Sequence, residues 1–434
     1  MNRLQMIKSR LATWSIGAVV SRILSILHRY GMGHIRFSKT LFEFVRLVKQ
    51  FDITPTLPVT ASVLNRHPYL FQKIQKMGVE FAIHGYKHVD YTQLSPKEVR
   101  EHFRHAIEIF NKHKIRWSGH RFPFLRWDEE KIDLLPGPKI EWDSSQVISW
   151  NSLNPKDFTE KAWQNYQKIL RTYQPVNADD TRSLPRMRNG WVEIPVSVPD
   201  DDILVERLGL MDGELMSSIW QRMMQKVRDR GELLVLQLHP ERFKCYTRAL
   251  ETLLGLARNQ GDVWIASLGE ITQWWKEKEK FSFNIEKVRP HRYRVITNSS
   301  DRATVLIQKD VKSDIKKQIP GFGVFVEEKC WEMESPVKPV IGVAPDMTRD
   351  TIGFLQEEGF AYEIMEDSNK CGYYLKHQNA FGEKEIKRIL NDIRNSRFPL
   401  LRYWRWPNRC RYSLAVTGDI DNVTISDFLE RFHG

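Results

Sequence analysis

The chain has 434 residues, a length typical of about two or three domains that each bury their own core. Apolar residues make up 41% of it and charged residues 28%, which excludes a polytopic membrane protein and long disorder. Four widely spaced cysteines without a CxxC pair exclude a thiolate zinc cluster and a secreted disulfide framework, so we expect a reducing compartment.

The net charge of +12 suits nucleic acid, anionic lipid or an anionic substrate. The sequence has no helix-turn-helix signature, RNP motif or long basic run, so we expect no nucleic-acid partner.

The first 30 residues predict an amphipathic basic helix. Apolar residues recur at helical spacing from Leu4 to Tyr30, while most of the arginines and lysines lie off that stripe. The apolar run at 11–20 is too short to cross a bilayer, and no small-residue cleavage site follows it. Two interpretations stay open, packing on the domain core or attachment to an anionic membrane face. We expect a cytoplasmic protein in either case, with peripheral membrane contact in the second.

Helical and strand patterns alternate from Ser38 to about Lys280. The predicted helices lie at 38–51, 67–77, 95–113, 212–230, 242–260 and 269–280. The predicted strands lie at 53–64, 79–83, 115–120, 232–240 and 262–268. Because polar side chains follow several of these strands, the repeated βα units predict a parallel α/β barrel or a doubly wound sheet.

The pattern changes at Phe281. Two antiparallel strands are expected at 291–300 and 302–311, followed by one small βα unit. The tail then holds an apolar strand, SLAVT, which is followed by Asp419, Asp421 and a helix. This tail either packs on the surface or completes the first domain. The chain therefore divides into a barrel with an N-terminal helix (1–280), an α+β insertion (281–399) and a C-terminal strand and helix (400–434).

Three motifs carry side chains suited to catalysis. His84 and His88 leave a predicted strand through Gly85, so both imidazoles could bind one divalent metal, although a structural role for the pair is equally open. His239 ends an apolar strand, where it is either a catalytic histidine or a strand cap bonded to the backbone. Arg121 precedes Phe122-Pro123 and either orients a carboxylate or lies on the surface.

Four ordered motifs together resemble the polysaccharide deacetylase family, also called the NodB-homology domain or carbohydrate esterase family four. They are His84-x-x-x-His88, Arg121-x-Pro123, the strand ending in His239-Pro240, and the closing segment DVWIASLGEITQWW at 262–275. The resemblance extends over about 38–280. That family opens with a strand ending in two acids, but the residues just before Ser38 contain none. The segment SLAVTGDIDNVT near the C-terminus resembles this missing strand, so we expect a circularly permuted domain. The expected fold is a deformed (β/α) barrel whose first strand comes from the C-terminus and lies beside the strand at 53–64.

The resemblance also implies roles for individual residues. Asp421 would bind a divalent metal, expected to be Zn²⁺, together with His84 and His88. Asp419 would be the general base, held by Arg121, and His239 the general acid. A structural alternative for the tail acids is helix initiation, since Thr424-x-x-Asp427 resembles a capping box. Substrate contacts are expected from Tyr86, Pro123, Phe124, Trp127 and Asp143.

The function implied is metal-dependent removal of an N-acetyl group from a polysaccharide or from a lipid-linked or nucleotide-linked N-acetylhexosamine, within glycan biosynthesis. Two alternatives remain. One is hydrolysis of another non-peptide C–N bond in a small molecule. The other is an inactive relative that binds carbohydrate.

Overall fold

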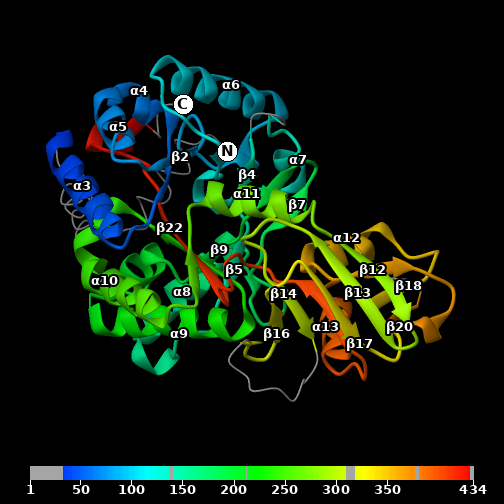
Figure 1. Ribbon diagram of the computed structural model, residues 1–434. Coiled ribbons are helices and arrows are strands. Elements are labelled where there is room, and N and C mark those ends of the chain that lie inside the picture. Colours follow the sequence, from blue (N-terminus) through cyan, green and yellow to red (C-terminus); the bar gives the residue numbers. More distant parts are fainter. Residues whose placement is uncertain (1–32, 137–139, 212, 309–317, 377–380, 431–434) are drawn as a thin grey trace.

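The computed structural model describes residues 33–136, 140–211, 213–308, 318–376 and 381–430 (Figure 1). The expected amphipathic helix of the first 30 residues lies outside the described residues. None of the described helices combines the length and the apolar character that crossing a bilayer requires.

A curled, mostly parallel sheet organises the larger part of the molecule. Eleven strands follow the order β6-β5-β9-β10-β22-β1-β2-β3-β4-β8-β7, and β11 pairs with β22 as the twelfth. Only the β7–β8 pair at one end is antiparallel. Their bounds are β1 Thr56–Val59, β2 Glu80–Ile83, β3 Gly119–His120, β4 Trp142–Asp143, β5 Val147–Ser149, β6 Val176–Asn177, β7 Arg186–Arg188, β8 Trp191–Glu193, β9 Val196–Val198, β10 Leu233–Leu238, β11 Val263–Ile265 and β22 Tyr412–Gly418. The expectation of a deformed (β/α) barrel with a smaller module is confirmed.

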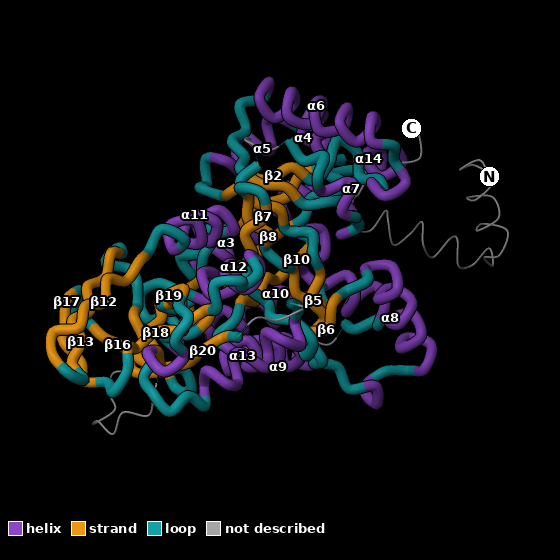
Figure 2. The backbone as a smooth tube through the Cα atoms, turned by 90° about the vertical axis from the view of Figure 1, so that its right-hand side faces the viewer, coloured by secondary structure: helices purple, strands orange, loops and turns teal. Residues whose placement is uncertain are grey.

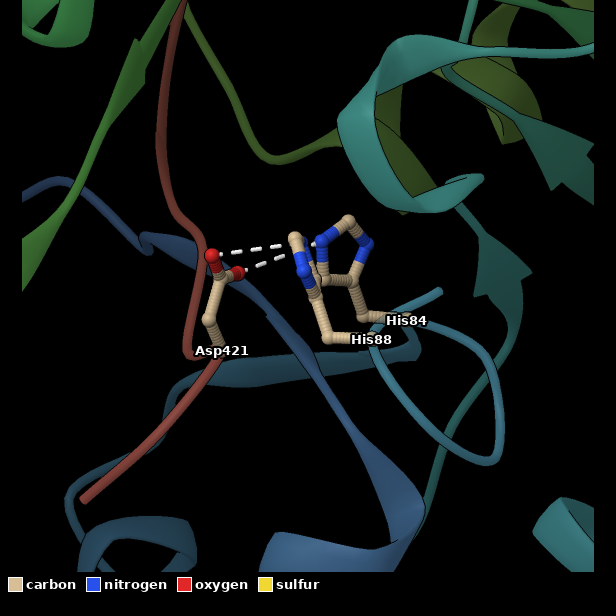
Figure 3. A group of neighbouring side chains, drawn as sticks. All are labelled: His84, His88 and Asp421. Carbon is tan, nitrogen blue, oxygen red and sulfur yellow. Dashed lines mark ion pairs between the residues drawn. The ribbon is translucent and has the colours of Figure 1, made fainter. Parts of the chain in front are cut away.

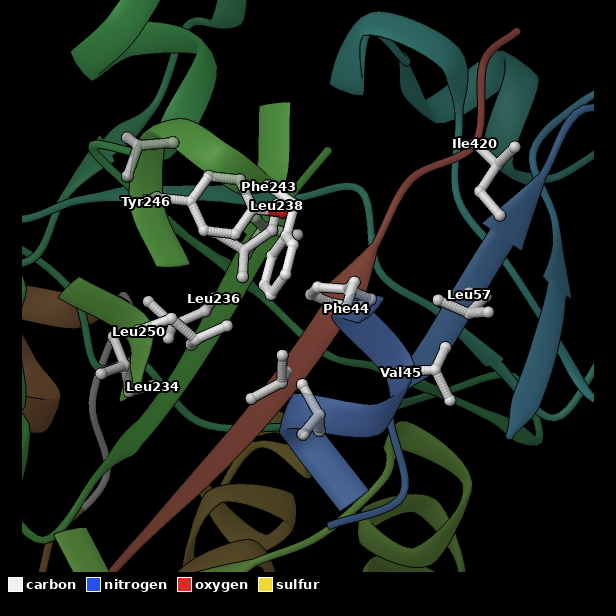
Figure 4. Packing of buried hydrophobic residues seen from close by; sticks show 14 of the residues in the cluster. Phe44, Val45, Leu57, Leu234, Leu236, Leu238, Phe243, Tyr246, Leu250 and Ile420 are labelled. Carbon is white, nitrogen blue, oxygen red and sulfur yellow. The ribbon is translucent and has the colours of Figure 1, made fainter. Parts of the chain in front are cut away.

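The C-terminal strand β22 lies in the middle of this sheet. It pairs in parallel with β10 from Leu233 and Ser413 to Leu238 and Gly418, and with β1 where Thr56 meets Thr417. All of its residues are buried, as expected for a parallel strand that is covered on both faces. Figure 4 shows it running between the leucines of β10 and Leu57 of β1. The tail acids therefore emerge at the same sheet edge as the histidines of the front half.

Helices cover both faces of the sheet, and the predicted ones lie within a few residues of their expected bounds. The predicted helices are α3 His34–Gln50, α5 Pro68–Gln75, α6 Pro96–Lys112, α9 Gly213–Arg230, α10 Phe243–Gln260 and α11 Leu268–Lys278. Helices α4 (Ala61–Arg66) and α8 (Glu160–Tyr173) were not predicted from the sequence. The strand expected at 53–64 is wrong in its second half, because the strand ends at Val59 and α4 begins at Ala61. Helix α6 begins at the predicted capping box, in which Ser95 and Glu98 bond each other's backbone N–H.

Close packing fixes α3 against the two central strands. Phe44 is fully buried on α3, and Leu57 of β1 is fully buried opposite it (Figure 4). A Cβ atom at Gly418 would lie 3.0 Å from both of these side chains, so glycine permits the helix to approach β22 this closely. Fully burying an aliphatic or aromatic side chain contributes about 1.5–3 kcal/mol each.

A smaller α+β module follows α11 and occupies one side of the molecule (Figure 1). It contains three small sheets, in the orders β12-β13-β17, β15-β16-β14-β21 and β19-β18-β20. The strands are β12 Ser282–Arg289, β13 Arg292–Asn298, β14 Val305–Gln308, β15 Gln318–Ile319, β16 Gly323–Val326, β17 Cys330–Glu334, β18 Lys338–Val343, β19 Tyr362–Ile364, β20 Cys371–Leu375 and β21 Leu400–Tyr403; the helices are α12 Arg349–Glu358 and α13 Glu383–Arg394. Because β21 pairs with β14, the chain leaves this module only after residue 403.

A buried ionic cluster joins the module to the barrel. Glu358 at the end of α12 accepts hydrogen bonds from Arg402 at 2.7 Å and Arg405 at 2.9 Å, and it also pairs with Arg182 of the barrel. Burial by itself raises the pKa of Glu358, but the three guanidinium groups outweigh it and hold that pKa well below its ordinary value. The cluster therefore remains ionised and fixes the module against the barrel.

Candidate metal centre

The candidate site lies where β2, β10 and β22 end. His84 follows β2 directly, His239 follows β10, and Asp419 and Asp421 follow β22. The carboxyl ends of parallel strands meet at one edge of a sheet, which is where such folds place their chemistry. Gly85 has a φ of +74°, and a Cβ there would lie 2.7 Å from the Tyr91 hydroxyl, so the turn from His84 toward His88 requires glycine.

Three side chains form a cluster with the geometry of a metal site. His84 Nε2 lies 3.4 Å from one oxygen of Asp421, and His88 Nε2 lies 3.1 Å from the other (Figure 3). One ligand atom from each residue lies within 4.8 Å of those from the other two. The His84 Nδ1 is 2.9 Å from the Arg121 carbonyl oxygen, and a hydrogen bond there leaves Nε2 as the available ligand. Two imidazole nitrogens and one carboxylate are a donor set that fits a catalytic divalent ion such as Zn²⁺.

The charge on Asp421 suits a metal ligand. Burial alone raises the pKa of this carboxyl, but the facing imidazoles of His88 and His84 outweigh burial and hold the pKa well below its ordinary value. Asp421 is therefore a carboxylate at neutral pH.

Asp419 is held rigidly beside the cluster. Arg121 donates to its Oδ1 at 2.6 Å, Gln237 donates to its Oδ2 at 2.7 Å, and His84 Nε2 lies 3.9 Å from Oδ2. Arg121 is fully buried and is itself fixed, because it also donates to Thr417 and to the carbonyl and hydroxyl oxygens of Ser144. The predicted contact between Arg121 and Asp419 is present, and the surface alternative for Arg121 is wrong. The role of Gln237 was not predicted from the sequence.

His239 forms an ion pair on the side away from the pocket. Its Nδ1 lies 2.8 Å from Asp201 Oδ1, and its backbone N–H donates to Asp201 Oδ2 at 3.1 Å. This arrangement leaves Nε2 for a substrate. Burial by itself lowers the pKa of His239, but the Asp201 carboxylate outweighs it and raises the pKa well above its ordinary value. Sequence reasoning missed Asp201, although three consecutive aspartates after the apolar strand β9 were a signal.

One cavity of about 140 Å³ brings these groups together. It is lined by both candidate metal histidines, both tail acids and His239. Its other walls are Phe124, Leu125, Tyr173, Asp202, Arg207, Gln237, Arg242 and Phe428. A larger cavity of about 300 Å³ lies between α11, β12 and β19 at the smaller module, but the residues that line it include no histidine. The smaller cavity is therefore the candidate active site.

Of the predicted substrate contacts, Phe124 alone lines this cavity. Its ring is 40% exposed and lies 4.2 Å from the His88 ring, centroid to centroid. Tyr86 packs against the rings of two histidines of α6, Pro123 is buried beside Gly85, and Trp127 lies under the Arg188 guanidinium. These three side chains are outside the cavity, so the structure gives no support to their predicted substrate contact.

The prediction that Asp143 contacts substrate is wrong in this structure. Asp143 is fully buried in β4, and its Oδ2 lies 2.7 Å from Nδ1 of the equally buried His120. Burial raises its pKa to about 7. A side chain enclosed on all sides and bonded to a neighbouring strand cannot reach a ligand in the cavity.

Comparison with known proteins agrees with the sequence resemblance. The model of the polysaccharide deacetylase family matches residues 17–136, a span that contains His84, His88 and Arg121. The resemblance to polysaccharide deacetylases is confirmed. The match ends before His239, Asp419 and Asp421. In the structure, these three residues line the same cavity as His84 and His88.

Solved structures that match the chain include two described as polysaccharide deacetylases. The one from Mycobacterium smegmatis is 20% identical, with a TM-score of 0.44 over 60% of this chain and 83% of that one. The one from Pseudomonas aeruginosa PAO1 is 19% identical, with a TM-score of 0.43 over 54% and 72%. The Puue allantoinase is 18% identical, with a TM-score of 0.42 over 54% and 72%. No curated protein matches the sequence.

Proposed function

We propose that this protein is a metal-dependent hydrolase that removes the N-acetyl group from a sugar. The observation that carries the proposal is that Asp421 meets His84 and His88 in the cavity that also contains Asp419 and His239. The match to the deacetylase family supports an acetylated carbohydrate as the substrate class. Zinc as the metal and a cytoplasmic location remain predictions from the sequence.

His84, His88 and Asp421 would hold the metal. When bound, a divalent ion in such a site polarises the substrate carbonyl and makes water more acidic. The protein's own contribution is to orient the two imidazoles and to keep the carboxylate ionised. The hydrogen bond between His84 Nδ1 and the Arg121 carbonyl fixes one ring, and the low pKa of Asp421 maintains its charge.

Asp419 is the proposed general base. Arg121 and Gln237 each occupy one of its oxygens, so the carboxylate cannot rotate, and each oxygen keeps lone pairs for a further proton donor. Asp419 would accept the proton of the water that attacks the acetyl carbon. Holding the base in one orientation avoids an entropy cost at the moment of proton transfer.

His239 is the proposed general acid. The ion pair with Asp201 keeps the imidazolium protonated and directs Nε2 away from Asp201. As the C–N bond breaks, His239 would give its proton to the departing sugar nitrogen, so that the products are acetate and a free amine. Phe124 would then form an apolar wall against which a pyranose ring can pack.

The test compares Asp421→Asn with wild type in zinc content and in acetate release from chitooligosaccharides, nucleotide-linked N-acetylhexosamines and small amides. We expect the variant to lose both stoichiometric zinc and activity, because one of three protein ligands is neutralised. Asp301→Asn, at an exposed position in the smaller module, is the control and should retain both. Unchanged zinc content and turnover in Asp421→Asn would refute the proposal. Release of a product from small amides alone would instead identify a hydrolase of another non-peptide C–N bond.

A further inference from the structure

We propose that the face formed by the first turns of α3 and α5 and by α14 (Ile425–Glu430) docks onto an anionic membrane, and that the substrate sugar reaches the cavity on a lipid carrier. The docking half of the proposal, that this face binds a membrane, is argued from surface charge and exposed apolar side chains. The lipid-carrier half rests on the proposed deacetylase function.

The positive charge of the chain is concentrated at its N-terminal end. Residues 1–79 contain twelve lysines and arginines against two acids, a net charge of +10 out of the +12 of the whole protein. Both acids have cationic neighbours, since Glu43 lies 4.0 Å from Lys39 and Asp52 lies 3.1 Å from Arg258. Arg36 and Lys39 are exposed cations in the first half of α3, and Lys73 near the end of α5 and Lys76 just after it are exposed farther along the same end of the chain. A surface with this charge attracts anionic lipid.

Three segments that are distant in sequence meet on this face. The His34 ring at the start of α3 lies 6.1 Å from the His67 ring, centroid to centroid, and His67 Nε2 lies 3.1 Å from Asp427 of α14. Arg66 also pairs with Asp427, and Figure 2 shows α14 beside α4 at one end of the molecule. These contacts hold the first turns of α3 and α5 and the C-terminal helix together.

Each of the three segments exposes a large apolar side chain beside its contact residue. Ile35 is 77% exposed next to His34, Tyr69 is 79% exposed two residues after His67, and Leu429 is 49% exposed two residues after Asp427. Apolar side chains among cations are typical of surfaces that enter the interface of a bilayer. Nucleic acid would be bound through phosphate contacts, which need cations and gain nothing from an exposed isoleucine or leucine.

The same face borders the candidate active site. Phe428 lines the cavity, while Leu429, the next residue of α14, points to solvent. A membrane docked against this face would therefore lie next to the cavity mouth, where a sugar attached to a lipid can enter.

The first experiment measures sedimentation of the full chain with vesicles of phosphatidylcholine and phosphatidylglycerol in equal parts. The triple variant Ile35→Ser, Tyr69→Ser, Leu429→Ser should bind at least about tenfold more weakly, because it removes the apolar anchors without touching the core. The double variant Val288→Ser, Ile364→Ser removes side chains that are 45% and 60% exposed on the smaller module and should bind like wild type.

Two further variants separate charge from apolar contact. Arg36→Glu with Lys39→Glu should weaken vesicle binding, because each cation near an anionic surface strengthens binding roughly fivefold. Lys287→Glu with Arg289→Glu on β12 is the matched control. The docking proposal is overturned if wild type does not sediment with these vesicles, if the triple variant binds as wild type does, or if a DNA duplex is bound in place of vesicles.

The second experiment compares acetate release from a lipid-linked N-acetylhexosamine in the same vesicles with release from soluble chitooligosaccharides. The triple variant should lose activity on the membrane-held substrate and retain it on the soluble one. Equal activity of variant and wild type on the membrane-held substrate would overturn the lipid-carrier half. Absence of acetate from every substrate would contradict the proposed function, while the vesicle binding result would still decide the docking half.

Discussion

Two histidine–aspartate groups, one of three residues and one of two, lie at the ends of strands in the same sheet, and their surroundings give them opposite properties. In the cavity, His88 and His84 face Asp421 and hold its pKa well below the ordinary value. Inside the sheet, His120 faces Asp143, whose pKa burial raises to about 7, while burial lowers the pKa of His120 well below its ordinary value. The same two residue types thus form a charged site at the cavity and, inside the sheet, a buried pair whose carboxyl gains a proton far more readily. Whether such a group is a candidate metal site or a structural pair therefore depends more on the access of ligands to it and on the neighbouring charges than on its residue types.

The largest expected effect is on the rate of the reaction. Asp419→Asn should lower kcat by about 10²–10⁴-fold, because it removes a general base, and should leave zinc content unchanged. Asp143→Asn should keep a kcat close to that of wild type. Steady-state acetate release measures both, and an equal loss in the two variants would contradict the assignment of Asp419 to catalysis and of Asp143 to the fold.

A shift in pH dependence is expected next. Asp201→Asn removes the carboxylate that raises the pKa of His239, so the basic limb of the pH–rate profile should move to lower pH. The wild-type ion pair also stabilises the fold below the ordinary histidine pKa of about 6.5, and this contribution is lost as the pH rises through the raised pKa. A pH–rate profile unchanged by Asp201→Asn would exclude His239 as the acid whose protonation controls the rate.

The buried pair should affect stability more than activity. Asp143→Asn weakens a buried hydrogen bond to His120, which should lower the free energy of unfolding by about 1–3 kcal/mol. Urea unfolding at neutral pH measures this difference. A variant as stable as wild type, but with zinc lost, would place Asp143 in the metal site and contradict the structural assignment.

The smallest effect concerns the cavity wall. Phe124→Ala should raise KM by about 2–10-fold with little change in kcat, since an aromatic contact contributes about 0.5–1.5 kcal/mol. Trp127→Ala is the matched control, because Trp127 packs against Arg188 outside the cavity. If the two substitutions raise KM equally, the substrate extends beyond the cavity described by the structure.

The sequence predicted much of the site because its main residues follow long, well-marked elements. β10 and β22 are mostly apolar strands of six and seven residues, so the positions of His239, Asp419 and Asp421 after their ends could be inferred. β4 has only two residues, and so short a strand does not reveal which way Asp143 points. Asp201 was missed because β9 has three residues and did not stand out as a strand. The direction of Tyr86 depends on the left-handed turn at Gly85, which spacing alone does not fix.

The central claim is that the tail supplies a metal ligand to two histidines of the front half. Anomalous diffraction from crystals grown with zinc tests it most directly. The account predicts one strong peak about 2 Å from His84 Nε2, His88 Nε2 and an oxygen of Asp421. A zinc ion bound elsewhere, or bound by the two histidines with Asp421 turned away, would contradict it.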